Sequence, residues 1–287
     1  MSPDAQSPQI SSLIRLLDDR DPFVTDRVGN RLVELGTEAV PFLEMACRGE
    51  NLTLKTRALG ILKRIAPRQL ADAFHNLSRT PDDIDLEKGV LLLMQFGHPS
   101  ADPEQVRHQL DQLAEGLAPK INQEEPGSQI LGRVTDYLFR QRGFHGNKDN
   151  YIDPDNSYFD TVLKNKVGLP ITLSVLCILI GQRLQIPIVG IGLPYHFIAK
   201  YNSTADPILF DPFYRGRTLT PEQCSEMVQG FGIQFEDHYL SPVTHREILT
   251  RMIQNLVNVY QKLGEEEKVS SLKEYSQILM GQNKRGR

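Results

Sequence analysis

The sequence predicts an α+β fold that is mostly helical, in which a buried central helix packs against an antiparallel sheet. Three observations lead to this prediction. The segment Ile171–Leu184 is apolar nearly all round, which is typical of a helix buried on every side. The chain then changes to the alternating pattern of strands up to Phe213. Stretches with helical periodicity lie both before and after this centre, so helical segments are expected to flank the sheet.

The composition is that of a globular chain, with 40% hydrophobic and 24% charged residues over 287 positions. The net charge of -4 gives no reason to expect a nucleic acid or an anionic membrane as partner. The longest apolar stretch, Ile171–Ile180, is shorter than the roughly 20 residues that span a bilayer. The three cysteines, Cys47, Cys177 and Cys224, are far apart and odd in number, so a disulfide framework is not expected. A cytoplasmic location follows from this cysteine usage and from a polar N-terminus without a signal segment.

Residues 1–80 are predicted to form a helical appendage. A weak repeat relates the segment after Asp21 to the segment after Asn51, and the run Leu16–Ala46 resembles a HEAT-like repeat. Apolar stripes of this kind serve packing more often than partner binding, so packing is the favoured interpretation. The helices expected here cover Ile10–Leu17, Val24–Leu35, Val40–Ala46 and Leu54–Ile65.

Residues 81–240 are predicted to form the core and residues 241–287 a helical hairpin with a basic tail. In the core, Gly143–Ser157 is polar and is expected to be a loop. The hairpin turns at Gly264 and resembles a single tetratricopeptide-type pair, which is more often a structural support than a binding groove. The helices expected in these segments cover Leu86–Phe96, Glu104–Leu117, Gln129–Gln141, His245–Leu263 and Glu265–Leu279.

A hairpin is predicted after the central helix, and it brings a histidine close to an aspartate. A six-residue turn separates the last two expected strands, and an even-numbered turn puts His196 and Asp211 on one face, within about 8 Å at the backbone. Gly190 and Gly192 alternate in the preceding strand, so another part of the molecule is expected to approach that strand closely. The three strands are expected over Ile186–Leu193, Tyr195–Tyr201 and Ile208–Phe213.

A buried helix followed by such a hairpin is an arrangement suited to thiol catalysis. The start of a helix lowers the pKa of a thiol, a histidine can take the thiol proton, and an aspartate can orient that histidine. This sequence supplies His196 and Asp211, but no cysteine stands at the helix start.

Four short motifs stand out in this region: Asn156-Ser157, Gly168-Leu169-Pro170-Ile171-Thr172-Leu173, Pro194-Tyr195-His196-Phe197, and Asp211-Pro212-Phe213 with Gly216. Together they resemble the SirB-type branch of the transglutaminase-like superfamily. The resemblance implies a papain-like α+β core, and enzymes of the wider superfamily use a Cys-His-Asp triad for acyl transfer or amide hydrolysis. The family commonly has glycine before the histidine, where this chain has Tyr195.

The nucleophile position of that triad falls at Pro170 or within two residues of it. Thr172 has the only hydroxyl there, and its high pKa demands a strong base. Cys177 lies about 10 Å further along the helix axis, among apolar neighbours that raise the pKa of a thiol and leave it inert. Cys177 is therefore interpreted as structural.

Two functional hypotheses stay open. The favoured one is a non-catalytic transglutaminase-like protein with a binding, scaffolding or regulatory role and a protein partner. The alternative is a hydrolase or acyltransferase that uses His196 and Asp211 with Thr172, or with an activated water, in place of the missing cysteine. A metal site at His196 and Asp211 or at Glu236–His238 is disfavoured because neither set has zinc-like spacing, and no cofactor is expected. Substrate, partner identity and oligomeric state are left open by the sequence.

Overall fold

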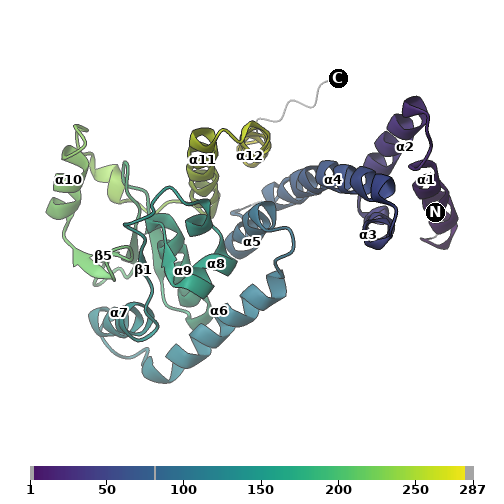
Figure 1. Ribbon diagram of the computed structural model, residues 1–287. Helices are drawn as coiled ribbons and strands as arrows, with labels where there is room; N and C mark the ends of the chain where they lie inside the picture. The colour runs from purple at the N-terminus through teal and green to yellow at the C-terminus, as the bar shows by residue number, and fades with distance from the viewer. Residues whose placement is uncertain (1–2, 81, 282–287) are drawn as a thin grey trace. The chain divides into compact units, whose positions relative to one another are not determined.

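A computed structural model describes residues 3–80 and 82–281, and the chain forms two compact units, 1–75 and 76–287 (Figure 1). The basic residues of the tail, Lys284, Arg285 and Arg287, lie outside the described residues. The division expected at residues 80 and 240 stays a prediction.

The first unit is helical and has a core of its own. Its second helix begins where the Asp21 carboxylate accepts a hydrogen bond from the Phe23 amide, and it ends at Gly36, whose φ of 59° few other residues adopt. The last helix runs well beyond Ile65, where it was expected to end, and contains Pro67. The helices are α1 (Pro3–Leu16), α2 (Pro22–Leu35), α3 (Val40–Arg48) and α4 (Leu52–Ser78), with a 3-10 turn at Gly36–Glu38. The buried apolar residues are Ile10, Leu17, Val28, Leu32, Ala39, Leu43, Ala58, Ile61 and Ile65.

The second unit surrounds one buried helix, α9 (Pro170–Leu184). Every residue of α9 from Pro170 to Gly181 is buried, as its apolar sequence predicts. The helix expected over Gln129–Gln141 is instead α7 followed by a π-helical turn over Asp136–Gln141. The other helices are α5 (Leu86–Gly97), α6 (Pro103–Leu117), α7 (Gly127–Thr135), α8 (Phe159–Asn165), α10 (Pro221–Gln229), α11 (His245–Leu263) and α12 (Glu266–Leu279). Single 3-10 turns lie at Ala118–Lys120, Pro154–Ser157 and Asp237–Leu240.

A four-stranded antiparallel sheet follows α9 in the chain. Its order is β3 (Ile188–Ile191), β4 (Ile198–Tyr201), β5 (Ile208–Asp211) and β6 (Arg217–Leu219). The first three strands are shorter than expected, and β4 begins only at Ile198, because Tyr195 leaves the extended conformation with a φ of 60°. The sequence did not predict β6, nor the two-residue strands β1 (His145–Gly146) and β2 (Val167–Gly168), which pair in parallel.

The sheet is covered on both faces. On one face Gly181 of α9 packs against Ile188, and a Cβ at Gly190 would lie 2.7 Å from the Phe197 ring, which confirms the close approach expected at this glycine. On the other face Cys224 and Val228 of α10 pack against Ile191, Ile198 and Leu209. The α+β class, mostly helical with a buried helix against an antiparallel sheet, is thereby confirmed.

The hairpin of α11 and α12 turns at Gly264 in the left-handed conformation, with φ of 73°. Two sets of hydrogen bonds stabilise the start of α11. Thr244 and Glu247 form a capping box, and the Asp83 carboxylate accepts hydrogen bonds from the His245 and Arg246 amides. In the part of the chain that the structure describes, no helix combines the length and the apolarity that crossing a membrane requires.

Candidate functional site

The hairpin register brings His196 to Asp211. Tyr201 pairs with Ile208 across the six-residue turn, and Ala199 pairs with Phe210, so Asp211 lies opposite Ile198. His196 lies before the strand, two residues ahead of Ile198, and its ring reaches Asp211 at the end of β5. Its Nε2 atom lies 2.7 Å from Oδ2 of Asp211.

The Asp211 carboxylate is buried and held on both oxygens. Its side chain is 2% exposed, and Oδ1 accepts hydrogen bonds from the amides of Phe213 at 2.9 Å and Tyr214 at 3.4 Å. A carboxylate offers only acceptor atoms, so the hydrogen in the contact with the second oxygen belongs to the imidazole. Nε2–H of His196 therefore donates to Asp211, and Nδ1 remains as the basic nitrogen.

The start of α9 lies at the same place. Leu169 is extended, with φ of -75° and ψ of 163°, and Pro170 occupies the first helical position without any side-chain cap. The Asn156 carbonyl accepts a hydrogen bond from the Leu169 amide, and the Asn156 side chain bonds to Asn147 and to the carbonyl of Asn150. The Asn156-Ser157 motif thus ties the loop before it to the entrance of the helix, where first-turn amides lack helical partners.

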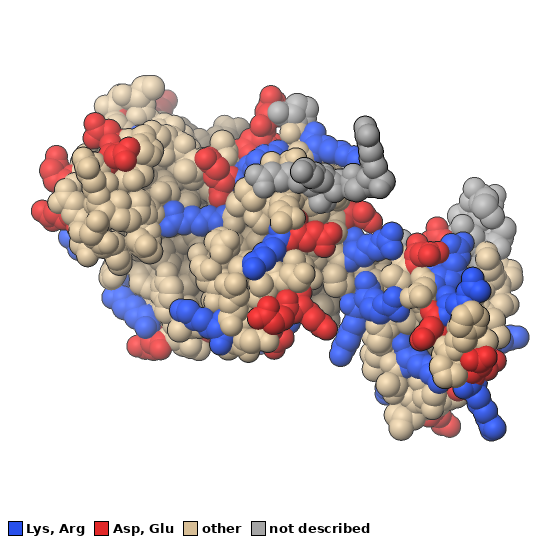
Figure 2. All heavy atoms as spheres, turned by 90° about the horizontal axis from the view of Figure 1, so that it is seen from above, with Lys and Arg blue, Asp and Glu red and all other residues tan. Residues whose placement is uncertain are grey.

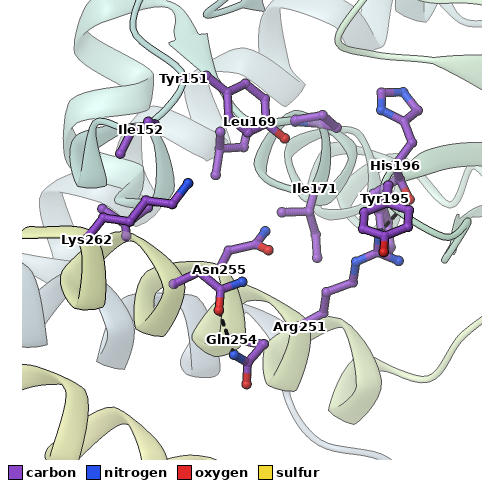
Figure 3. Close-up of a pocket in the computed structure, with 14 residues that line it drawn as sticks. Tyr151, Ile152, Leu169, Ile171, Tyr195, His196, Arg251, Gln254, Asn255 and Lys262 are labelled. Carbon is purple, nitrogen blue, oxygen red and sulfur yellow. Dashed lines mark hydrogen bonds between the residues drawn. The ribbon is translucent and has the colours of Figure 1, made fainter. Parts of the chain in front are cut away.

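A cavity of about 480 Å³ opens between the start of α9 and one side of α11. Figure 3 shows Leu169 and Ile171 opposite Arg251, Asn255 and other residues of α11, with His196 at one end and Lys262 at the other. The side chain of His196 is 12% exposed. The remaining lining residues include Tyr151, Ile152, Pro170, Tyr195, Phe197, Gln254, Asn258 and Val259.

Thr172, the candidate replacement for the nucleophile, and the two cysteines of this unit are all absent from the residues that line this cavity. Thr172 is fully buried, its Oγ1 has no hydrogen-bond partner, and it is absent from the lining residues. Cys177 is fully buried, and burial raises its pKa well above the ordinary range of a thiol. Cys224 is buried in α10, where burial and the charges of Asp211 and Glu222 raise its pKa to about 11. The structure thus brings His196 and Asp211 together and keeps Thr172 apart from them.

Metal-binding clusters are absent from the described residues, since no group of three histidine, cysteine or acidic side chains converges there. His238 and Glu236 form only a pair, 3.1 Å apart and exposed.

The sequence did not predict that residues of α11 line the cavity. Arg251, Asn255, Asn258 and Lys262 recur every three or four residues, which on a helix places them along one stripe. Such a stripe is ordinarily a solvated face, so the pattern alone carries no signal of a cavity.

Comparison with known proteins agrees with this geometry. The family model described as "Transglutaminase-like superfamily" matches residues 104–254. A UPF0162 protein of Xylella fastidiosa is 32% identical over 200 residues, which cover 67% of this chain and 71% of the relative. A UPF0162 protein of Vibrio cholerae is 26% identical over 133 residues, or 46% of this chain and 49% of that protein.

A more distant relative is human F-box only protein 21, which is 25% identical over 258 residues. The match covers 79% of this chain but 40% of that protein. No solved structure matches the chain significantly. The matched region spans more than half of the chain and contains α9, the sheet, His196 and Asp211, and the chain belongs to the transglutaminase-like superfamily.

Proposed function

We propose that this chain is a non-catalytic protein of the SirB-type branch, which acts by binding a protein partner at the cavity beside His196. One observation carries the proposal. The residues that the start of α9 presents to the cavity are Leu169, Pro170 and Ile171, and none of them has a nucleophilic atom. The site therefore lacks the protein nucleophile that covalent acyl transfer requires.

The His196–Asp211 pair has a structural role in this proposal. It links the loop before β4 to the end of β5, and the same carboxylate holds the turn at Phe213 and Tyr214. The HEAT-like helices of residues 1–80 and the tetratricopeptide-like hairpin of residues 241–287 are proposed as supports of a scaffolding or regulatory role. A reducing cytoplasm suits the three free thiols.

Turnover measurements on the full chain test this proposal. The probes are a p-nitrophenyl ester, a fluorogenic amide, and a glutamine peptide supplied with a primary amine, which cover ester hydrolysis, amide hydrolysis and acyl transfer. The expected result is no turnover above buffer, with His196→Ala altering only thermal stability. Turnover that disappears in His196→Ala while the variant stays folded would overturn the non-catalytic assignment.

A second candidate function is hydrolysis by a water that His196 activates. It is favoured by one geometric feature of a working base: the imidazole lines the cavity and Asp211 orients it through Nε2, while no contact of Nδ1 is found among the described residues. In that case turnover should disappear in His196→Gln, whose amide cannot take a proton from water. Asp211→Asn should lower kcat more than KM, because the aspartate acts through the imidazole.

A further inference from the structure

Arg251 is a half-buried cation whose only protein partners are neutral. Its Nη2 donates hydrogen bonds to the carbonyls of Leu193 and His196, each at 2.7 Å, and its guanidinium lies 5.4 Å from the centre of the Phe197 ring. Within residues 3–80 and 82–281, no carboxylate lies within ion-pair distance of it. Nε and Nη1 are left as donors beside the cavity.

Another half-buried arginine of this unit, Arg183, has its charge balanced by carboxylates. Arg183 lies 2.6 Å from Glu87 and 2.7 Å from Asp111. Buried cations are ordinarily paired in this way, because an unpaired charge removed from water is costly. Arg251 therefore points to an anion that the chain itself does not supply.

The residues that line the cavity carry an excess of positive charge. Its 14 lining residues include Arg251 and Lys262 but neither aspartate nor glutamate. The first turn of α9, where Pro170 and Ile171 line the cavity, adds the positive end of a helix dipole. The excess is local, because on the face shown in Figure 2 basic and acidic side chains are intermingled.

The spacing of Arg251 and Lys262 on α11 indicates the length of a ligand that could contact both. Arg251 and Lys262 are eleven residues apart, which corresponds to about 16 Å along a helix axis. An extended peptide covers that length in about five residues. Between the two cations lie the amides of Asn255 and Asn258, which can both donate to and accept from a peptide backbone.

Exposed aromatic rings border the cavity at the Arg251 end. Tyr195 is 70% exposed and Phe231 is 58% exposed, and their ring centres lie 4.9 Å apart. Tyr151 is 48% exposed and also lines the cavity. Tyrosine at the edge of a cationic pocket is typical of surfaces that bind other proteins.

We propose that an extended acidic segment of a partner protein occupies this cavity, with one carboxylate at Arg251 and a second at Lys262. This inference rests on the proposed binding function and specifies the chemistry of the partner. A nucleic acid does not fit this chemistry, because only two cations lie in a cavity of about 480 Å³.

Fluorescence anisotropy with the full chain tests the proposal. The probe is a fluorescein-labelled hexapeptide with glutamate at its first and last positions and alanine between, and the comparison peptide carries glutamine at both ends. The glutamate peptide is expected to bind, and its affinity should fall as salt is raised. The glutamine peptide should bind at least about tenfold more weakly, because charge-assisted hydrogen bonds to Arg251 are lost.

Three variants locate the binding. Lys262 lies on the surface, so Lys262→Gln should lower the affinity for the glutamate peptide about threefold. Arg251→Gln should lower the affinity for the glutamate peptide at least about tenfold, and thermal melting checks that the variant is folded. Lys273→Gln, an exposed lysine of α12 outside the cavity, is the matched control and should bind as the unmodified chain does. Equal affinity for the two peptides, or an equal loss in Lys273→Gln and Lys262→Gln, would overturn the proposal.

Mass spectrometry of the glutamate peptide after incubation separates this inference from the function on which it rests. Binding without cleavage supports both. Binding with cleavage that His196→Ala abolishes retains the acidic ligand but removes the non-catalytic assignment. Absence of both binding and cleavage removes the acidic ligand and leaves the non-catalytic assignment standing.

Discussion

Nε2 of His196 lies 2.7 Å from Oδ2 of Asp211, and the other oxygen of the same carboxylate accepts the Phe213 amide at 2.9 Å. One buried carboxylate thus joins two segments of the chain. The carboxylate of Asp211 is fixed by the backbone of the turn after β5 as well as by His196.

Asp211→Ala should destabilise the protein more than Asp211→Asn, by about 1–2 kcal/mol. Asparagine retains an oxygen for the amides of Phe213 and Tyr214, whereas alanine leaves these amides without an acceptor. Urea unfolding of both variants measures the difference, with exposed Asp206→Ala as the control that should change little. Equal losses in the two variants would mean that the turn does not depend on this carboxylate.

Thr172→Val should leave stability unchanged or raise it by up to about 1 kcal/mol. The Thr172 hydroxyl is fully buried without a hydrogen-bond partner, and valine has nearly the same shape without the cost of a buried polar atom. Thermal unfolding beside Thr172→Ser, which keeps the hydroxyl and removes a methyl group, provides the comparison. A clear loss of stability in the valine variant would reveal a partner for this hydroxyl.

Pro170→Cys in a Cys47→Ser background should create a thiol that reacts with iodoacetamide below the pH at which ordinary thiols react. The new side chain would stand at the positive end of α9, in the cavity that His196 also lines, and a helix start and a nearby histidine both stabilise a thiolate. The reaction rate is followed against pH by mass spectrometry. Cys177 and Cys224 serve as internal controls, since both are buried and have raised pKa values. A rate no faster than that of free cysteine at neutral pH would contradict this account of the vacant position.

Tyr195→Gly should be more stable than Tyr195→Ala by about 1 kcal/mol, and Tyr195→Val should be the least stable of the three. Tyr195 has a φ of 60°, a conformation that glycine adopts without strain and that a β-branched residue resists. Urea unfolding of the three variants isolates the backbone effect, because all of them lose the contact with Phe231 alike.

Stability should fall between about pH 9 and 11 by roughly 2 kcal/mol because of Cys224. Burial and the neighbouring carboxylates of Asp211 and Glu222 raise the folded pKa of Cys224 from 9.0 to about 11. The folded state therefore keeps a proton that the unfolded state has already lost in this interval. The stabilisation is complete below the unfolded pKa and is lost as pH rises through the folded one. Cys224→Ala should show a flatter decline in urea unfolding from pH 8 to 11, and an unchanged slope would contradict the raised pKa.

The sequence by itself determined the centre of the fold. A helix without a polar face has to be buried on every side, and α9 is. An even turn between two alternating segments predicted that His196 and Asp211 lie close together. The pairing of Tyr201 with Ile208 agrees with that turn, and the two side chains are in contact, although His196 itself lies before β4. These features depend on local periodicity, which a sequence displays directly.

Only the tertiary structure decided what surrounds that centre. The polar stripe from Arg251 to Lys262 looks like a solvated face until α11 is packed against the start of α9. The rotation of α9 about its axis turns Thr172 into the core and leaves Ile171 at the cavity, although both occupy the same turn. The pairing of His145 with Val167 likewise rests on contacts between distant segments. Such outcomes depend on how separate elements meet, and local periodicity carries no information about that.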